Sequence, residues 1–298
     1  NIKPDYAEAY SNKGNTLKLL GKYDDAVKAY SKAIQLKPNY AEAYNNRGVI
    51  YKELNQTDLA LKDLKKAISL KPDYPEANST LGVTLLLTGD FSKGWEQYEW
   101  RWKDLSDPSV IRSFKQPLWD GKKSLKGKSI LLYSEQGLGD TIQFSRYILL
   151  IKALGAKVIL ETHKELLNIV GSIDSDITVI LMGQALPHFD FQCPLLSLPL
   201  KFGTGLKNIP FPTRYIWADK RKVSKWKKKI DAQQKPLIGL AWEGNPLHKN
   251  DHNRSISLAE LIPHLPTQYK YIGLQKDIRK PNLDTLKKNT MINNLVAN

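Results

Sequence analysis

The stretch KPDYAEAYSNKGNTL, residues 3–17, decides the fold of the first part of the chain. Two similar stretches follow it, KPNYAEAYNNRGVIY at residues 37–51 and KPDYPEANSTLGVTL at residues 71–85. The three copies start 34 residues apart. A fixed period of this length predicts a stack of helical units in which each unit packs on its neighbours.

The period and the small and aromatic positions of these copies resemble tetratricopeptide repeats. The resemblance implies that residues 1–105 form an α-solenoid of three helical hairpins, the last of them degenerate. Gly14, Gly48 and Gly82 would let the paired helices approach closely. The matching positions are Tyr10, Gly14, Ala26, Tyr30, Ala33 and Pro38 in the first repeat, and Tyr44, Gly48, Ala60, Leu64, Ala67 and Pro72 in the second.

The third repeat departs from the pattern and continues as GWEQYEWRW, residues 94–102. Trp95, Tyr98 and Trp102 are three and four residues apart, so they share one side of a helix. We expect them to form a cap that packs on the next domain. An aromatic platform for a sugar is the alternative.

Asn12 and Asn46 occupy the same position in successive repeats, on the first helix of each hairpin. Side-chain amides there could hydrogen-bond an extended peptide backbone. This arrangement resembles the asparagine ladder of the O-GlcNAc transferase repeats, although Thr80 interrupts it in the third repeat. We predict a peptide-binding groove, with solvated asparagines as the simpler alternative.

Residues 106–126 lack helical or strand periodicity and are predicted to be a surface linker. After them, SILLYS (129–134) and KVILE (157–161) have the pattern of buried strands, and residues 141–155 have the apolar stripe of a helix. A helix at 164–173 and strands at 177–181 and 189–192 continue the alternation. Such alternation predicts a parallel sheet, which we place in an α/β lobe over residues 127–233.

The turn between the first strand and helix of this lobe contains Gly137, Gly139 and Asp140. With Glu161 downstream, it superficially satisfies a dinucleotide-binding fingerprint. The third glycine of that fingerprint is replaced by Ile142, and the carboxylate of Asp140 would occupy the helix N-terminus that a pyrophosphate needs. These features argue against an NAD or FAD site.

Asp140 has two other interpretations. It could cap the helix and form a capping box with Gln143. The segment EQGLGDTIQFSRY also resembles the turn of family 9, heptosyltransferase-like glycosyltransferases. That resemblance implies a GT-B-like Rossmann lobe, with Asp140 as catalytic base and with Gly137 and Gly139 giving the acceptor room.

Residues 234–298 begin a second alternation, with strands at 237–242 and 270–275 and a helix capped by Ser257 and Glu260. The segment resembles the start of a second Rossmann-like lobe. The resemblance implies that Lys249 and Arg254 neutralise the diphosphate of a nucleotide sugar.

The same resemblance implies an inverting sugar transfer to a peptide or glycan hydroxyl, with no cofactor. His248 and His252 raise the question of a metal, but they lie in an Asn-rich loop, and no metal is expected. The sequence starts with a motif that ends the other repeats, and it lacks the acidic-and-histidine turn that holds a nucleotide sugar. We therefore expect a fragment with an incomplete donor site. The competing function is a non-catalytic scaffold for protein–protein interaction.

The formal charge of +15 is concentrated after the repeats. Residues 220–229, KRKVSKWKKK, contain seven cations, and Val223, Trp226 and Ile230 follow a helical spacing. The simplest interpretation is a helix that buries this stripe, and docking to an anionic membrane surface is the alternative. Nucleic acid is not expected, because no nucleic-acid-binding pattern accompanies the charge.

Cys193 is the lone cysteine, which suits a reducing cytoplasm, and no cation or histidine nearby would activate its thiol. No apolar run approaches the ~20 residues that a transmembrane helix needs.

Overall fold

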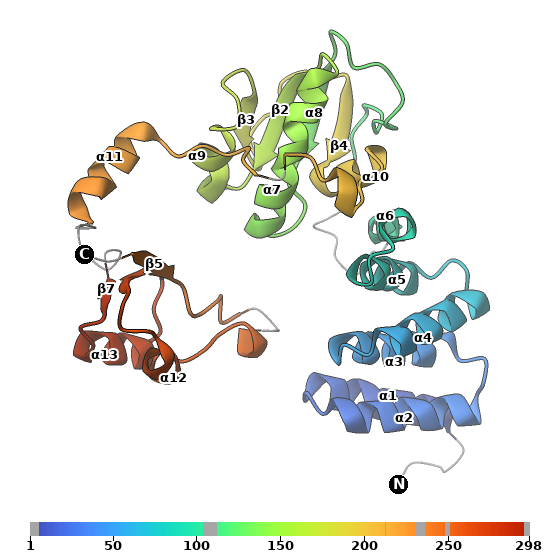
Figure 1. Ribbon diagram of the computed structural model, residues 1–298. Helices are drawn as coiled ribbons and strands as arrows, with labels where there is room; N and C mark the ends of the chain where they lie inside the picture. Colours follow the sequence, from blue (N-terminus) through green and yellow to red (C-terminus); the bar gives the residue numbers. More distant parts are fainter. Residues whose placement is uncertain (1–5, 104–111, 212, 231–235, 248–250, 295–298) are drawn as a thin grey trace. The chain divides into compact units, whose positions relative to one another are not determined.

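The computed structural model describes residues 6–103, 112–211, 213–230, 236–247 and 251–294. The chain divides into two compact units, Asn1–Trp217 and Ala218–Asn298. The first unit contains a helical array followed by an α/β lobe, and the second contains a smaller α/β lobe (Figure 1). No helix in the described part of the chain is long and apolar enough to span a membrane.

Three helical hairpins stack in the first unit, as the 34-residue period predicts (Figure 1). The third hairpin continues into a 3₁₀ helix, Glu99–Lys103. The helices are α1 (Ala7–Leu19), α2 (Tyr23–Leu36), α3 (Ala41–Glu53), α4 (Thr57–Leu70), α5 (Pro75–Leu87) and α6 (Phe91–Tyr98).

The repeat glycines lie where two helices touch. A Cβ atom on Gly14 would lie 2.6 Å from the ring of Tyr30, and one on Gly82 would lie 2.5 Å from the backbone nitrogen of Tyr98. Real Cβ atoms do not approach other atoms so closely. The expected close approach of the paired helices is therefore confirmed.

Arg47 joins the first two hairpins through one hydrogen bond and the helices of the second hairpin through an ion pair. Arg47 on α3 donates two hydrogen bonds to Asp63 on α4, of 2.6 and 2.9 Å, and a third of 2.9 Å to Ser31 on α2. One guanidinium thus connects both helices of the second hairpin to the second helix of the first. This fork geometry is specific to arginine.

The α/β lobe contains a four-stranded sheet in the order β3-β2-β1-β4, and every pairing is parallel. The prediction of a parallel sheet is confirmed. In the register, Leu132 lies opposite both Leu160 and Cys193. The strands are β1 (Ser129–Tyr133), β2 (Lys157–Thr162), β3 (Thr178–Leu181) and β4 (Phe191–Pro194).

The single helix predicted for residues 141–155 is in fact broken. The Ser145 hydroxyl donates to the carbonyl of Ile142 at 2.8 Å, and such a local bond competes with the helical pattern. Of the predicted stripe, Leu154 remains 43% exposed. The segment forms α7 (Leu138–Phe144), a 3₁₀ turn (Ser145–Tyr147) and α8 (Ile148–Ala153).

The helix predicted at 164–173 is also shorter than expected. It consists of a 3₁₀ turn, Lys164–Leu166, and one turn of α-helix, α9 (Leu167–Val170). After β4 come a 3₁₀ turn (Leu195–Ser197), α10 (Leu198–Lys201) and a further 3₁₀ turn (Leu206–Asn208).

Both faces of the sheet are covered. Ile130 and Leu132 pack with the helices on one face, and Leu131 and Tyr133 pack with Phe189 on the other. The end of the predicted linker joins this core, because Trp119 is 1% exposed and its backbone N–H donates to the Gln192 carbonyl at 2.9 Å.

The second unit has a three-stranded parallel sheet in the order β5-β6-β7. The capping box that the sequence predicts is confirmed: Glu260 N–H donates to Ser257 Oγ at 3.2 Å, and Ser257 N–H donates to the Glu260 carboxylate at 3.3 Å. The sequence did not predict α13 or β7. The elements are α11 (Lys220–Lys229), β5 (Leu237–Leu240), a 3₁₀ turn (Asp251–Asn253), α12 (Leu258–Leu261), a 3₁₀ turn (Ile262–His264), β6 (Lys270–Gly273), α13 (Lys280–Lys288) and β7 (Ile292–Asn294).

Candidate functional sites: the repeat surface and the turn after β1

Asn15 on α1 and Asn46 on α3 form a polar pair between the first helices of two successive hairpins. The Asn46 amide donates to Asn15 Oδ1 at 3.1 Å, and the same oxygen accepts a 2.7 Å bond from the Tyr30 hydroxyl. Asn12 is exposed, and its backbone carbonyl accepts a bond from Thr16. The structure therefore brings Asn46 together with Asn15 rather than with Asn12.

The Asn15–Asn46 pair can bind a further polar group. Among the described residues, Asn15 Nδ2 and Asn46 Oδ1 have no hydrogen-bond partner, which leaves an amide NH2 group and a carbonyl oxygen unused. Burial raises the pKa of Tyr30 to about 12, so its hydroxyl keeps its proton and holds Asn15 in place. The repeat pattern does not reveal Asn15, because the residue one period later is Val49.

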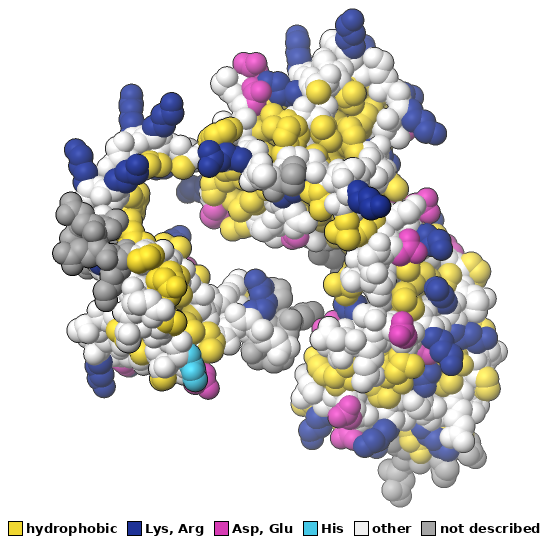
Figure 2. Space-filling view, in the orientation of Figure 1, with side chains coloured by type: hydrophobic (Ala, Val, Ile, Leu, Met, Phe, Trp, Pro, Cys, Tyr) yellow, Lys and Arg dark blue, Asp and Glu magenta, His cyan; other side chains and the backbone are white. Residues whose placement is uncertain are grey.

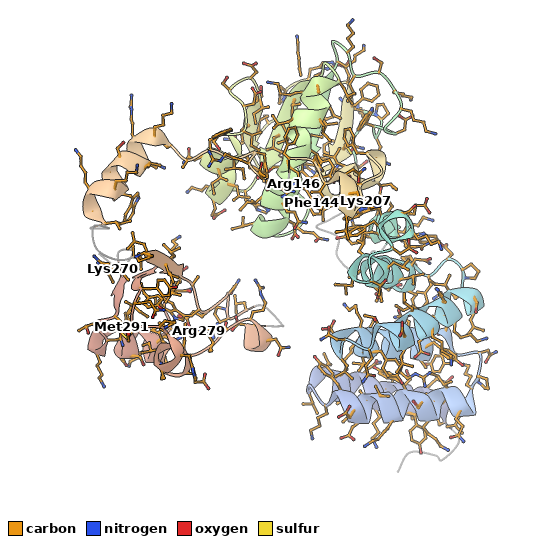
Figure 3. The ribbon with its side chains drawn as sticks, in the orientation of Figure 1. Phe144, Arg146, Lys207, Lys270, Arg279 and Met291 are labelled. Atoms are coloured by element: carbon orange, nitrogen blue, oxygen red, sulfur yellow. The ribbon has the colours of Figure 1, made fainter. Side chains whose placement is uncertain are left out.

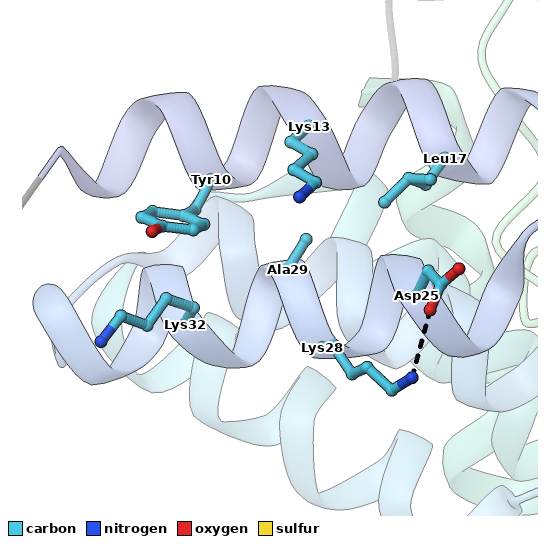
Figure 4. A pocket seen from close by; sticks show the side chains of 7 residues that line it. All are labelled: Tyr10, Lys13, Leu17, Asp25, Lys28, Ala29 and Lys32. Atoms are coloured by element: carbon cyan, nitrogen blue, oxygen red, sulfur yellow. Dashed lines mark hydrogen bonds and ion pairs between the residues drawn. The ribbon is translucent and has the colours of Figure 1, made fainter. Parts of the chain in front are cut away.

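A pocket of about 390 Å³ lies between α1 and α2 (Figure 4). Lys28 is paired there with Asp25 at 3.2 Å. Lys13 is the counterpart of Arg47 one period later, and the equivalent face of the second hairpin is the one on which α2 packs. The pocket therefore lies on the face of the first hairpin that corresponds to the face of the second hairpin on which α2 packs. It is lined by Tyr10, Lys13, Leu17, Asp25, Lys28, Ala29 and Lys32.

The third hairpin is attached to the α/β lobe by buried polar contacts. Arg101 donates two hydrogen bonds to Glu135, of 2.9 and 3.1 Å, and one of 2.8 Å to Ser197. The side chain of Arg101 is 6% exposed and that of Glu135 is fully buried. Since Glu135 is the second residue after β1, the array contacts the loop that leads into α7.

The aromatic residues of the third hairpin surround this contact. The Trp95 indole donates to the Thr204 carbonyl at 2.9 Å and lies edge-on to Phe144, with ring centroids 6.0 Å apart (Phe144 is labelled in Figure 3). Tyr98 packs on the same core, and Trp102 packs on the opposite face of the sheet. The prediction of a cap that packs on the next domain is confirmed.

Asp140 is the third residue of α7, whose N-cap is Gly137. Its Oδ2 atom accepts a 3.2 Å bond from the Gly137 N–H. The prediction that Asp140 itself is the N-cap, with Gln143 completing a box, is wrong, because the helix starts earlier than expected. Asp140 stabilises the helix start from inside the first turn, and its side chain is half-exposed.

The two glycines beside Asp140 are not required by packing within the protein. A Cβ atom on Gly139 would meet nothing within 4 Å, and one on Gly137 would meet only Asp140 Oδ2, at 3.4 Å. Open space therefore adjoins Gly139, and the Asp140 carboxylate itself is partly exposed. The turn lies at the carboxyl edge of the parallel sheet, where α/β proteins commonly bind ligands.

His163 and Tyr98 also lie at this turn; the sequence indicated Tyr98 only as part of the aromatic cap and did not indicate His163. His163 Nε2 is 3.0 Å from the Gln136 carbonyl, and the Gln136 amide donates to the Tyr98 hydroxyl at 2.8 Å. Burial is the main cause that raises the pKa of Tyr98. His163 could have been found from its place just after β2, since neighbouring parallel strands end at the same edge.

Glu161 does not have the role that a dinucleotide site would require. Its carboxylate is 1% exposed and is paired with the Arg112 guanidinium. The Gly183 N–H donates to the same carboxylate at 3.3 Å. With these partners, Glu161 is a structural residue rather than a free ribose ligand.

Cys193 is equally unsuited to chemistry. It is fully buried in β4, and burial raises the pKa of its thiol. A buried neutral thiol is a poor nucleophile.

In the second unit, Arg254 is exposed, and its backbone N–H donates to the Asp251 carbonyl at 2.9 Å. Lys249 and His248 lie outside the described residues, as does the side chain of His252. Among the residues described, no cluster of three or more His, Cys, Asp or Glu side chains is arranged to hold a metal.

The carboxylates near Arg254 are occupied by internal partners. The buried Glu243 accepts bonds of 2.8 Å from the Arg279 backbone and from the Asn282 amide. Asp251 is paired with the Arg279 guanidinium and accepts a 2.8 Å bond from Ser255 (Arg279 is labelled in Figure 3). This network fixes the loops after β5 and β6.

Comparison with known proteins identifies the helical array. The family described as TPR repeat matches residues 14–55, and the family described as tetratricopeptide repeat matches residues 41–74. No curated protein matches the chain.

Among solved structures, the second TPR of Spaghetti (RPAP3) bound to the HSP90 peptide SRMEEVD is 26% identical. The match covers 32% of this chain and 87% of that one, with a TM-score of 0.31. The first TPR domain of human RPAP3 is 25% identical over 35% of this chain and 84% of that one, with a TM-score of 0.33. The Sgt2 TPR domain from Aspergillus fumigatus is 26% identical over 32% and 62%, with a TM-score of 0.31. On its period, its packing and its family matches, the helical array of this chain consists of tetratricopeptide repeats.

Proposed function

We propose that the protein binds an extended peptide along the surface that α1, α3 and α5 share. Tetratricopeptide repeats imply protein–protein interaction. The observation that carries the proposal is the Asn15–Asn46 pair, which keeps one amide donor and one carbonyl acceptor unused. A peptide backbone offers the complementary acceptor and donor, and Asn12 adds an exposed amide on the same helix.

Selection from an unbiased displayed peptide library against the whole chain tests this proposal. The selected peptides are then measured against a double variant, Asn12→Ala with Asn46→Ala. We expect Kd to rise roughly tenfold, because two net hydrogen bonds are lost. Asn168→Ala, an exposed asparagine on α9, is the matched control. An unchanged Kd in a folded double variant would contradict the proposal.

Sugar transfer is a second candidate function, supported by the open space beside Gly139 and by the partial exposure of Asp140. We propose a GT-B-like, family 9-like glycosyltransferase that takes a nucleotide sugar as donor. Asp140 would accept the proton of an acceptor hydroxyl while the hydroxyl oxygen bonds to the anomeric carbon. The bond from that carbon to the diphosphate breaks at the same time, so the configuration inverts. Lys249 and Arg254 would neutralise the departing diphosphate without a metal.

Release of nucleoside diphosphate from a panel of nucleotide sugars tests this second candidate. In an active protein, Asp140→Asn should lower turnover roughly 100-fold or more, because an amide cannot accept the proton. Asp90→Asn is the matched control, since Asp90 also caps a helix, accepting from the Lys93 N–H at 3.3 Å. Unimpaired turnover by Asp140→Asn would end the catalytic role of this residue.

A further inference from the structure

The basic helix α11 has an uncovered apolar stripe. It contains no buried residue, and Val223 and Trp226 are 38% and 39% exposed. The prediction that the helix buries this stripe is therefore wrong. The local sequence suffices to form the helix, because Asp219 caps its start by accepting a 2.9 Å bond from the Lys222 N–H.

The stripe and the charges occupy different sides of the helix. With 3.6 residues per turn, Val223, Trp226 and Ile230 fall within a sector of about 60°. Cations border this sector on both sides, and others point away from it. The cations are Lys220, Arg221, Lys222, Lys225, Lys227, Lys228 and Lys229.

The charge on this helix has a single sign. Residues 220–229 include no acidic side chain, so no carboxylate of the helix itself neutralises the cations. The Lys229 ammonium lies 5.4 Å from the centre of the Trp226 ring. The exposed aromatic ring thus has a cation beside it, and lysine and arginine side chains, dark blue in Figure 2, supply the charge of the helix. This combination fits a surface that is both anionic and partly apolar.

We propose that α11 docks on an anionic lipid surface. Val223, Trp226 and Ile230 enter the boundary between headgroups and acyl chains, and the bordering lysines pair with lipid phosphates. A tryptophan suits that boundary, because its ring is apolar and its N–H needs a polar partner. Nucleic acid would account for the cations but not for the clustering of three apolar side chains on one side. This inference is independent of the peptide groove and of Asp140.

Co-sedimentation of the whole chain with phosphatidylcholine vesicles, with and without phosphatidylserine, tests the proposal. We expect partition only onto the anionic vesicles. The triple variant Lys222→Gln, Lys227→Gln and Lys229→Gln should weaken it about 100-fold, at about 1 kcal/mol for each cation. The matched control is Lys62→Gln, Lys65→Gln and Lys66→Gln, which removes three exposed cations from α4 and should change partition little.

The apolar stripe has its own test. Trp226→Ser should abolish the part of the partition that survives high salt, since only the charged contacts are screened. The emission of Trp226 is obtained by subtracting the fluorescence spectrum of Trp226→Phe from that of the parent. This emission should shift to shorter wavelength on anionic vesicles. Equal partition of the α11 and α4 triple variants, or of Trp226→Ser and the parent, would overturn the proposal. It would also be overturned if α11 were required for binding a DNA duplex while no vesicle binds.

Discussion

Arg101, at the end of the third repeat, and Glu135, two residues after β1, form a bidentate ion pair in which both side chains are buried. The Leu196 N–H adds a third bond to Glu135, of 3.2 Å. The contact joins the last helical turn of the repeats to the loop that precedes α7, the helix that contains Asp140. The array and the lobe therefore share part of one core.

Removing one partner of this pair should be costly. Arg101→Met should lower the stability of the first unit by about 3–5 kcal/mol, because the buried Glu135 carboxylate loses its counter-charge. Adding Glu135→Leu to that variant should recover much of the loss. Urea unfolding followed by circular dichroism measures both. A single variant as stable as the parent would show that Glu135 finds another partner.

The close packing of α5 against α6 in the third hairpin should depend on Gly82. Gly82→Ala should cost about 1–3 kcal/mol, because the new Cβ would collide with backbone atoms of Tyr98. Gly139→Ala is the control, since its Cβ meets nothing within 4 Å and alanine favours helix by up to about 1 kcal/mol. Thermal melts of the two variants should therefore move in opposite directions. A neutral Gly82→Ala would refute the close packing of α5 against α6.

Substitution of Arg112 and substitution of Glu161 should lower the thermal stability by different amounts. Glu161 is 1% exposed and Arg112 is 28% exposed, so Arg112→Gln strands a buried charge whereas Glu161→Gln leaves a cation that water can reach. We expect Arg112→Gln to lower Tm more than Glu161→Gln does.

Calorimetric titration with NAD should detect no binding to the parent protein. Binding that disappears in Glu161→Gln would instead restore the dinucleotide interpretation.

Low pH should lower the stability of the second unit, because Asp251 becomes protonated. Hydrogen bonds from Ser255 and Arg279 hold the pKa of Asp251 below its ordinary value of 3.8. The folded state thus binds the proton less readily than the unfolded chain, and the stabilisation is complete above pH 3.8. It is lost as the pH falls through the lowered value. Asp251→Asn should reduce Tm at neutral pH, with a difference that disappears in strong acid. A difference that stays constant down to pH 2 would show that the charge of Asp251 is irrelevant.

The features that depend on neighbours along the chain follow from the amino-acid sequence alone. The 34-residue period placed Gly14 where a helix must approach Tyr30, and the spacing of Trp95 and Tyr98 indicated a face that packs on the lobe. The alternation after residue 127 predicted the parallel sheet, and Ser257 with Glu260 predicted the start of α12. These signals are local, because helix and strand periodicities and caps involve residues a few positions apart.

Which polar groups meet depends on the tertiary fold. Arg101 and Glu135 are 34 residues apart, but Glu135 lies outside the repeats, and Arg112 and Glu161 are 49 residues apart. No sequence pattern therefore pairs these residues. Burial leaves each carboxylate needing a counter-charge, and the fold determines which cation reaches it. The same reason explains why Asn46 pairs with Asn15 rather than standing in a ladder with Asn12, and why α11 keeps its stripe uncovered. A helical pattern specifies an apolar side, but what covers that side depends on the rest of the fold.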